Sequence, residues 1–292
     1  MGPILFFIYI NDIVRSSNKI KFLLYADDTT VYIQGNHMDE IVDTMNNELA
    51  KVSEWIASNN LTLNVSKTCY MVSSISNINE DHVHIKIGNN LLTRVKHIKF
   101  LGINIDDRLT WKPHLNQLCN KISQMTGIFY RIRNNLTVHC LKLLYMSIVY
   151  PHLLYCSAIW GGAFSTLIDG IFVAQEKIVR VMFSCKRYDH TNPLFSQYSL
   201  LKVPDIIALQ TCIFVFKSIH VYPNDTNFES LSHNVNTRRP NDLRLPLCRT
   251  VQAQPSVNVR GVREWNNLPH DAKNITSINL FRNKMKYSLF QS

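Results

Sequence analysis

The segment KFLLYADDTTVYI, Lys21–Ile33, places two adjacent carboxylates between two runs of apolar and β-branched residues. Both runs have the composition of β-strands. Ala-Asp-Asp between them is typical of a tight turn, because Asp side chains hydrogen-bond their own backbone. The segment therefore predicts a β-hairpin with Asp27 and Asp28 at its tip.

Two interpretations of this acidic pair are open at this point. In the first, the two acids only favour the bend. In the second, the bend directs both side chains into a cleft, where neighbouring anions repel each other unless divalent cations lie between them. A pair of such cations activates a hydroxyl for attack and stabilises a departing phosphate. The rest of the chain has to distinguish the two.

The charge of the chain is unevenly distributed. The net charge is +10 over 292 residues. Residues 1–110 carry ten Lys and Arg against twelve Asp and Glu, whereas residues 111–292 carry 21 against nine. This distribution suits a protein that binds a polyanion with its basic second part. The nearly neutral first part, which carries the paired acids, would then perform the chemistry. The alternative is a protein whose surface is simply unevenly charged.

The cysteines indicate a reducing, intracellular compartment, nucleus or cytoplasm. They are odd in number and widely spread, without a Cys-x-x-Cys pair, which argues against a disulfide framework or a zinc ribbon. The apolar start of the chain is interrupted by Asn11-Asp12, too early for a membrane span, so we expect no membrane partner. The seven cysteines are Cys69, Cys119, Cys140, Cys156, Cys185, Cys212 and Cys248.

The hydrophobic periodicity predicts an α+β fold in three parts. Residues 1–110 mix helical and strand-like spacing, so we expect an antiparallel sheet with helices on one face. Residues 111–220 change to helical spacing throughout, and residues 221–292 form a basic segment with a short amphipathic tail. The expected helices of the first part cover residues 2–10 and 38–59, and its expected strands cover 21–33, 61–65, 69–72, 84–95 and 98–105.

Four blocks in order, GPILFFIYINDI, LLYADDTTVY, WIASNNLTLNVSKT and IKFLGINID, resemble the later palm motifs of reverse transcriptases of non-LTR, jockey-like retrotransposons. Downstream, WKPHLNQLCNKI and LLYMSIVYPHLLYCSAIWGG resemble the thumb and following region of that family, and VREWNNLP resembles its C-terminal segment. The resemblance covers nearly the whole chain. It implies a partial polymerase palm over residues 1–110, a helical thumb-like region over 111–220 and a basic C-terminal segment over 221–292.

The resemblance implies RNA-directed DNA polymerisation by two-metal nucleotidyl transfer. Asp27 and Asp28 are then the paired catalytic acids, with Asp27 binding metal directly and Asp28 assisting. The ion is Mg²⁺, with Mn²⁺ as an alternative, and the intact family site holds two ions. Lys67 matches a family lysine that neutralises or protonates the leaving pyrophosphate; alternatively, it is a solvated lysine at a strand end.

The same resemblance implies an RNA template, a DNA primer and dNTP substrates. The Phe100–Gly102 turn resembles the primer-grip turn of the family, where glycine permits close approach of the backbone; an ordinary hairpin glycine would look the same. Tyr25 and Ala26 would flank the primer terminus and the nucleotide, or only pack within the strand. The expected nucleotide- and primer-binding residues are Gly2, Pro3, Tyr25, Ala26, Phe100, Leu101 and Gly102.

Basic residues of the second and third parts are expected to bind nucleic-acid phosphates. Lys121, Arg131 and Arg133 lie near an amphipathic helix whose apolar face is accounted for by packing. Arg238 and Arg239 belong to a later basic cluster that either binds RNA or only keeps a loop exposed to solvent.

The family's fingers and its first catalytic Asp have no counterpart in these 292 residues. A two-metal site normally needs that carboxylate to bridge both ions. We therefore expect this chain alone to have little or no polymerase activity. The alternative function is a non-catalytic RNA- or DNA-binding remnant of the polymerase.

Overall fold

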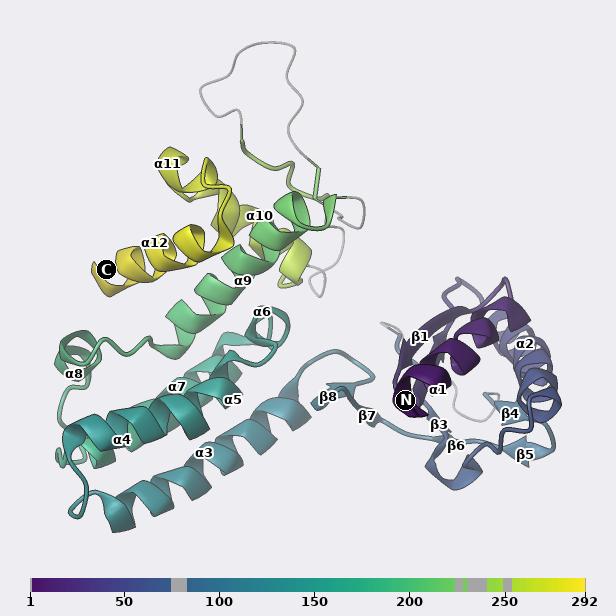
Figure 1. The fold of residues 1–292 in the computed structure, drawn as a ribbon, viewed down its shortest axis with the longest axis horizontal. Coiled ribbons are helices and arrows are strands. Elements are labelled where there is room, and N and C mark those ends of the chain that lie inside the picture. The colour runs from purple at the N-terminus through teal and green to yellow at the C-terminus, as the bar shows by residue number, and fades with distance from the viewer. Residues whose placement is uncertain (1, 75–82, 224–227, 230–240, 249–253, 292) are drawn as a thin grey trace. The chain divides into compact units, whose positions relative to one another are not determined.

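The computed structural model describes residues 2–74, 83–223, 228–229, 241–248 and 254–291 (Figure 1). The chain divides into two compact units. Unit 1 comprises Met1–Lys99 and Asp106–Leu109, and unit 2 comprises Phe100–Ile105 and Thr110–Ser292. Unit 1 combines helices with short strands and unit 2 is built of helices apart from one hairpin segment, which confirms the α+β class.

Unit 1 begins with helix α1 (Gly2–Ile10), a 3₁₀ turn η1 (Asn11–Ser16) and the predicted hairpin of β1 (Lys21–Tyr25) and β2 (Asp28–Tyr32). Helix α2 (Met38–Ser58) follows and is amphipathic, as its spacing predicts. One face of the hairpin packs on α2 and η1, because alternate strand residues point to the same side. Residues of this first core include Ile13, Ile20 and Val52.

The remaining strands form separate pairs in place of the single antiparallel sheet expected for residues 1–110. The strands are β3 (Cys69–Tyr70), β4 (Lys86–Ile87), β5 (Asn90–Leu91), β6 (Thr93–Arg94), β7 (His97–Phe100) and β8 (Ile103–Asp106). Within the described residues they make two-stranded sheets only, and β3 pairs with β6 in parallel. Most are two residues long, which is too short to add a third neighbour with full pairing.

Two strand predictions were wrong for local reasons. Residues 61–65 alternate in polarity but lead into a 3₁₀ turn, η2 (Val65–Lys67), because Thr68 Oγ1 donates a hydrogen bond to Asn64 O at 2.9 Å and Ser66 Oγ donates to Asn64 Oδ1 at 2.7 Å. Residues 98–105 form a hairpin, since Leu101 and Gly102 have positive φ angles of 45° and 86°, and two such residues in succession are typical of a hairpin turn.

Unit 2 is a helical assembly around one large apolar core (Figure 1). Helix α3 packs along α7, and α9 is contacted by α5, α6, α7, α10 and α12. The helices are α3 (Lys112–Ile132), α4 (Val138–Leu144), a π-helical turn η4 (Tyr145–Val149), α5 (Tyr150–Leu154), α6 (Ser157–Trp160), α7 (Ser165–Met182), α8 (Asn192–Gln197), α9 (Val203–His220), α10 (Val257–Asn266), α11 (His270–Lys273) and α12 (Ile278–Gln291).

Helix α9 is the centre of this unit. Within the described ranges it is the one helix long and apolar enough to cross a membrane by length and composition. Half of that window is buried, however, and Ile206, Leu209 and Phe216 are fully enclosed by neighbouring helices. A helix that is apolar on all sides suits the middle of a soluble core equally well, and these contacts account for its composition.

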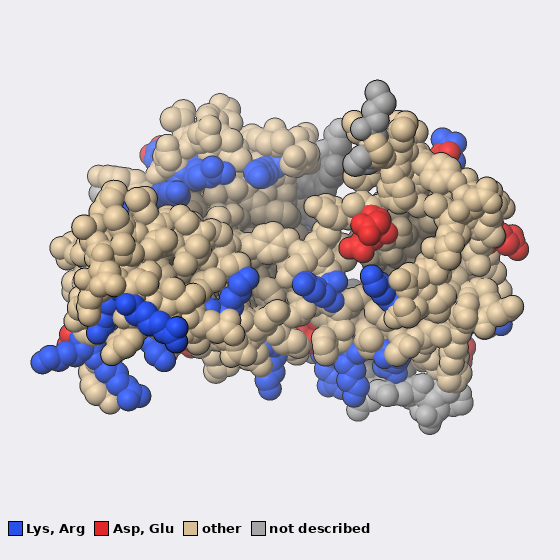
Figure 2. Space-filling model, turned by 60° about the horizontal axis from the view of Figure 1, so that its bottom comes forward, with Lys and Arg blue, Asp and Glu red and all other residues tan. Residues whose placement is uncertain are grey.

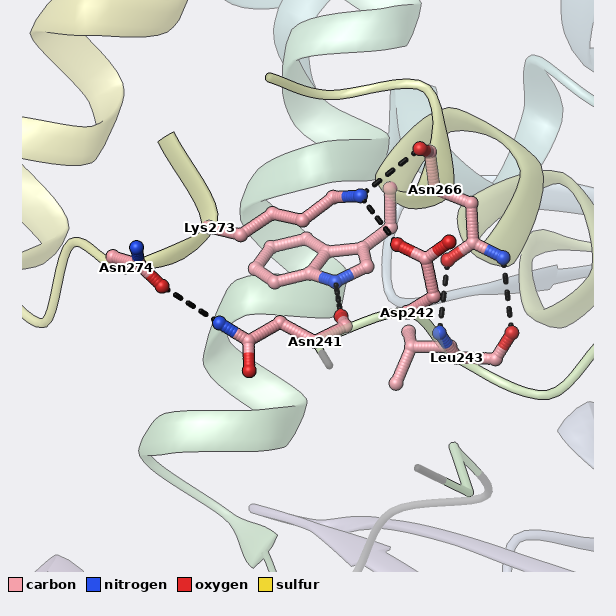
Figure 3. A network of polar contacts seen from close by, with 7 residues as sticks. Asn241, Asp242, Leu243, Asn266, Lys273 and Asn274 are labelled. Atoms are coloured by element: carbon pink, nitrogen blue, oxygen red, sulfur yellow. Dashed lines mark hydrogen bonds and ion pairs between the residues drawn. The ribbon is translucent and has the colours of Figure 1, made fainter. Parts of the chain in front are cut away.

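The C-terminal segment is attached to this core by a buried polar network (Figure 3). Lys273 Nζ lies 2.6 Å from Asp242 Oδ1 and donates to Asn266 O at 2.9 Å. The Asn266 side chain bonds both the N–H and the carbonyl of Leu243, each at 2.9 Å, and the indole of Trp265 donates to Asn241 O at 3.0 Å. Trp265 and Asn266 in VREWNNLP therefore serve packing and loop attachment.

Candidate active site and nucleic-acid interface

The paired acids lie where the sequence predicts, at the tip of the β1–β2 hairpin. Leu24 pairs with Thr29 and Tyr25 with Asp28, so Ala26 and Asp27 form a two-residue turn. Ala26 has a φ of 52°, as two-residue hairpin turns require. The side chains of Asp27 and Asp28 are both exposed.

Helix α1 lies beside this turn and completes a shallow depression of about 300 Å³. Gly2, Phe6 and Phe7 of α1 line it together with Ala26 and Asp27. The volume is at the lower end of that of small-molecule sites. The structure thus brings together three predicted site residues, Gly2, Ala26 and Asp27. Two phenylalanines that sequence reasoning missed join them, although helical spacing from Gly2 would have placed Phe6 on its face.

Among the described side chains, this depression is not lined by the other predicted residues of unit 1, Tyr25, Asp28 and Lys67. Tyr25 is 62% exposed on the strand, and Asp28 opens β2. Pro3 lies in the first turn of α1. Lys67 ends η2 with an exposed side chain, held locally by the backbone bond from its N–H to Asn64 O at 3.2 Å.

The chemistry of the acidic pair fits a hard divalent cation. Carboxylate oxygens are preferred Mg²⁺ ligands, and Mg²⁺ is commonly bound through one or two carboxylates plus substrate phosphates. Both side chains are exposed, and Asp27 lines the depression. Within the described ranges, no group of three or more His, Cys, Asp or Glu side chains is arranged to hold a metal.

The predicted primer-grip turn belongs to unit 2. Phe100 is half-buried, whereas Leu101 and Gly102 are exposed. Tyr155 Oη donates a hydrogen bond to Leu101 O at 2.5 Å, and Asn104 Nδ2 donates to Gln117 Oε1 at 2.6 Å. The turn is therefore attached to the helices, and no sequence signal pointed to Tyr155.

Helix α3 presents a polar face to solvent. Lys121 and Arg131 are exposed, and Lys121 Nζ lies 3.5 Å from His152 Nδ1 of α5. Partial burial and the nearby Lys121 charge lower the pKa of His152. Arg133 is half-buried, with its guanidinium 4.5 Å from the centre of the Tyr130 ring. Arg238 and Arg239 lie outside the described residues.

Basic side chains outnumber acidic ones on the face drawn in Figure 2. A positive surface attracts a polyanion through screened long-range electrostatics and counterion release. The face of α3 has one further property that suits an extended ligand. A Cβ on Gly127 would meet no atom within 4 Å, so the helix backbone there is open to approach.

Comparison with known proteins bears on both units. Residues 1–105 match the family model described as reverse transcriptase (RNA-dependent DNA polymerase). The chain is 25% identical over 224 residues to a probable RNA-directed DNA polymerase from transposon BS of Drosophila melanogaster, covering 72% of this chain and 24% of that protein. It is 26% identical over 218 residues to the RNA-directed DNA polymerase from mobile element jockey of Drosophila funebris, covering 71% and 24%.

A second jockey polymerase, from Drosophila melanogaster, is 23% identical over 287 residues, which is 94% of this chain and 29% of the relative. The chain thus spans about a quarter of the length of the curated relatives it matches. No solved structure matches it. The resemblance drawn from the motifs is confirmed: residues 1–105 match the reverse-transcriptase family, and most of the chain is similar to the RNA-directed DNA polymerases of jockey and related mobile elements.

Proposed function

We propose that the chain contributes the acidic pair and a nucleic-acid-binding helical region to an RNA-directed DNA polymerase. Unit 1 is then part of the palm, and unit 2 contains the thumb and the C-terminal segment. The observation that carries the proposal is the pair Asp27-Asp28 on a hairpin turn beside α1, within the residues that match the reverse-transcriptase family. RNA template, DNA primer and dNTP are the partners and substrates.

The proposal gives roles to residues of the depression and to two predicted residues outside it, Asp28 and Lys67. Asp27 and Asp28 hold Mg²⁺, with Asp27, which lines the depression, as the direct ligand. When bound, the ion supplies a charge that activates the primer hydroxyl and stabilises the leaving phosphate. Phe6 and Phe7 offer an apolar wall, and Gly2 lets a ligand approach the first turn of α1. Lys67 would neutralise charge on the departing pyrophosphate.

We further propose that these 292 residues do not polymerise by themselves, since the acidic pair has no third ligating side chain in the described part of the chain. Two exposed carboxylates hold Mg²⁺ weakly until substrate phosphates join them. All seven cysteines are free, which supports a reducing, intracellular site of action.

Iron-directed cleavage tests the metal site without requiring activity. Fe²⁺ bound in place of Mg²⁺ generates hydroxyl radicals with ascorbate and peroxide, and these cut the backbone near the ion. We expect cleavage around residues 2–7 and 25–29, reduced by Mg²⁺ competition and lost in Asp27→Asn. Asp43→Asn, an exposed acid of α2, is the matched control and should cleave as the wild type does.

Primer extension with Mg²⁺ or Mn²⁺ is the second measurement. Incorporation of dNTP by the purified chain that depends on Asp27 would overturn the proposed inactivity while supporting the site. Cleavage that is absent, or unchanged in Asp27→Asn, would overturn the site itself.

A second candidate function is nucleic-acid binding without catalysis, favoured by the exposed Lys121 and Arg131 on α3. Each phosphate contact releases counterions, so affinity for a duplex should fall steeply with salt. We expect Lys121→Ala combined with Arg131→Ala to reduce the slope of log affinity against log salt by about 2. Asp27→Asn and the exposed control Lys217→Ala should leave it unchanged. A slope that the double variant does not alter would exclude this face.

A further inference from the structure

Two side-chain hydrogen bonds join the Phe100–Gly102 turn and the residues just after it to the helical part of unit 2. Tyr155 donates its hydroxyl to Leu101 O at 2.5 Å, and its ring lies 3.6 Å from the position that a Cβ on Gly102 would take. Asn104, just beyond the turn, donates to Gln117 of α3 at 2.6 Å. The turn therefore groups with the helical unit, while the rest of β7 groups with unit 1.

Tyr155 is itself held in place by the core. It follows the end of α5, and Cys156 after it has a left-handed φ of 52°, so the chain bends sharply there. The indole of Trp160, which is fully buried, donates to Tyr155 O at 2.8 Å. A hydrogen-bonded path thus leads from a buried tryptophan through Tyr155 to the turn.

The turn needs such support because Leu101 occupies the left-handed region, at a φ of 45°. This conformation is costly for a residue with a Cβ and persists only where surrounding contacts hold it. The hydrogen bond to Leu101 O fixes the orientation of the peptide between Leu101 and Gly102. The exposed side of that peptide is then presented in one direction to a ligand.

We propose that Tyr155 is a positioning residue for the primer terminus, acting through the Leu101–Gly102 peptide. The inference rests on the proposed function and extends it, because primer placement would then be set by the α5–α6 junction, about 50 residues downstream of the turn. Tyr155 orients the backbone that meets the primer and does not itself join the chemistry.

The test compares two duplexes that differ only at the end. Fluorescence anisotropy measures the affinity of the full chain for a primer–template with a recessed 3′ end and for a blunt duplex. Tyr155→Phe keeps the ring and removes the hydroxyl. We expect it to weaken recessed-end binding about threefold to tenfold, the usual effect of one lost hydrogen bond, with blunt-duplex binding within about twofold of the wild type. Tyr188→Phe, at a tyrosine of the same unit that is 85% exposed, is the matched control.

Hydrogen exchange of residues 100–105 without nucleic acid provides a readout independent of binding. We expect faster exchange in Tyr155→Phe and Tyr155→Ala, and no change in Tyr188→Phe. Equal weakening of recessed and blunt duplexes, or wild-type binding together with wild-type exchange, would overturn the positioning role alone. Failure of the wild-type chain to bind either duplex would overturn the proposed function together with this inference.

Discussion

The buried ion pair between Lys273 and Asp242 predicts a large, coupled loss of stability when one partner is removed. Their side chains are only 4% and 9% exposed, and Nζ and Oδ1 lie 2.6 Å apart (Figure 3). Lys273→Met retains most of the volume but removes the ammonium charge beside Asp242 and the donor to Asn266 O. Breaking a buried pair in this way costs about 3–5 kcal/mol of the free energy of unfolding.

A double-mutant cycle separates the pair from its surroundings. Lys273→Met, Asp242→Asn and the combined variant are unfolded in urea in a Trp55→Phe background, so that the tryptophan fluorescence comes from unit 2, including the buried Trp160 and Trp265. We expect each single variant to be strongly destabilised and the double variant to lose less than the sum, with a coupling of about 1–3 kcal/mol.

The exposed pair Arg244–Glu229 is the control, at 3.3 Å and with side chains 67% and 72% exposed. Arg244→Met should cost less than about 1 kcal/mol because exposed pairs are screened and mobile. If Lys273→Met were no more costly than Arg244→Met, or the cycle were strictly additive, the assigned role of the buried network would be wrong.

Three further predictions concern packing and pH. Gly161→Ala should destabilise unit 2 by about 1–3 kcal/mol, because the new Cβ would lie 2.4 Å from Ile207 Cγ2. Gly170→Ala should stabilise the same unit by about 0.5–1 kcal/mol, because its Cβ would meet no atom within 4 Å. Thermal unfolding of the two variants tests both. Burial lowers the pKa of His114, so the unfolded state binds its proton first and stability should fall as pH drops below about 6.5. His152 and His220 also have lowered pKa values, so His114→Leu should reduce, without abolishing, the pH dependence of the unfolding midpoint between pH 7.5 and 5.5; an unchanged slope would contradict this. Hydrogen bonds from Lys51 and Ser17 lower the pKa of Glu48, so Glu48→Gln should remove stability that is present above about pH 4.5 and lost on further acidification, measured as the acid unfolding midpoint of unit 1.

The sequence by itself determined the elements whose signals are local. The hairpin with Asp27 and Asp28 at its tip follows from β-branched runs around a turn, and α2, α3 and α7 follow from apolar residues at helical spacing. The order of motifs also pointed to the similarity with reverse transcriptases that residues 1–105 show, because each motif is a short, continuous stretch.

Only the tertiary structure decided which residues meet across long separations. Tyr155 reaches Leu101 over 54 positions and Lys273 reaches Asp242 over 31, and neither contact leaves a periodic or compositional trace in the chain. The strand predicted at 61–65 failed for the opposite reason. Local hydrogen bonds of Asn64, Ser66 and Thr68 outweighed an alternating pattern that pairs with no strand in the described part of the chain. Polarity patterns specify a face, whereas pairing and burial depend on what the rest of the fold brings to that face.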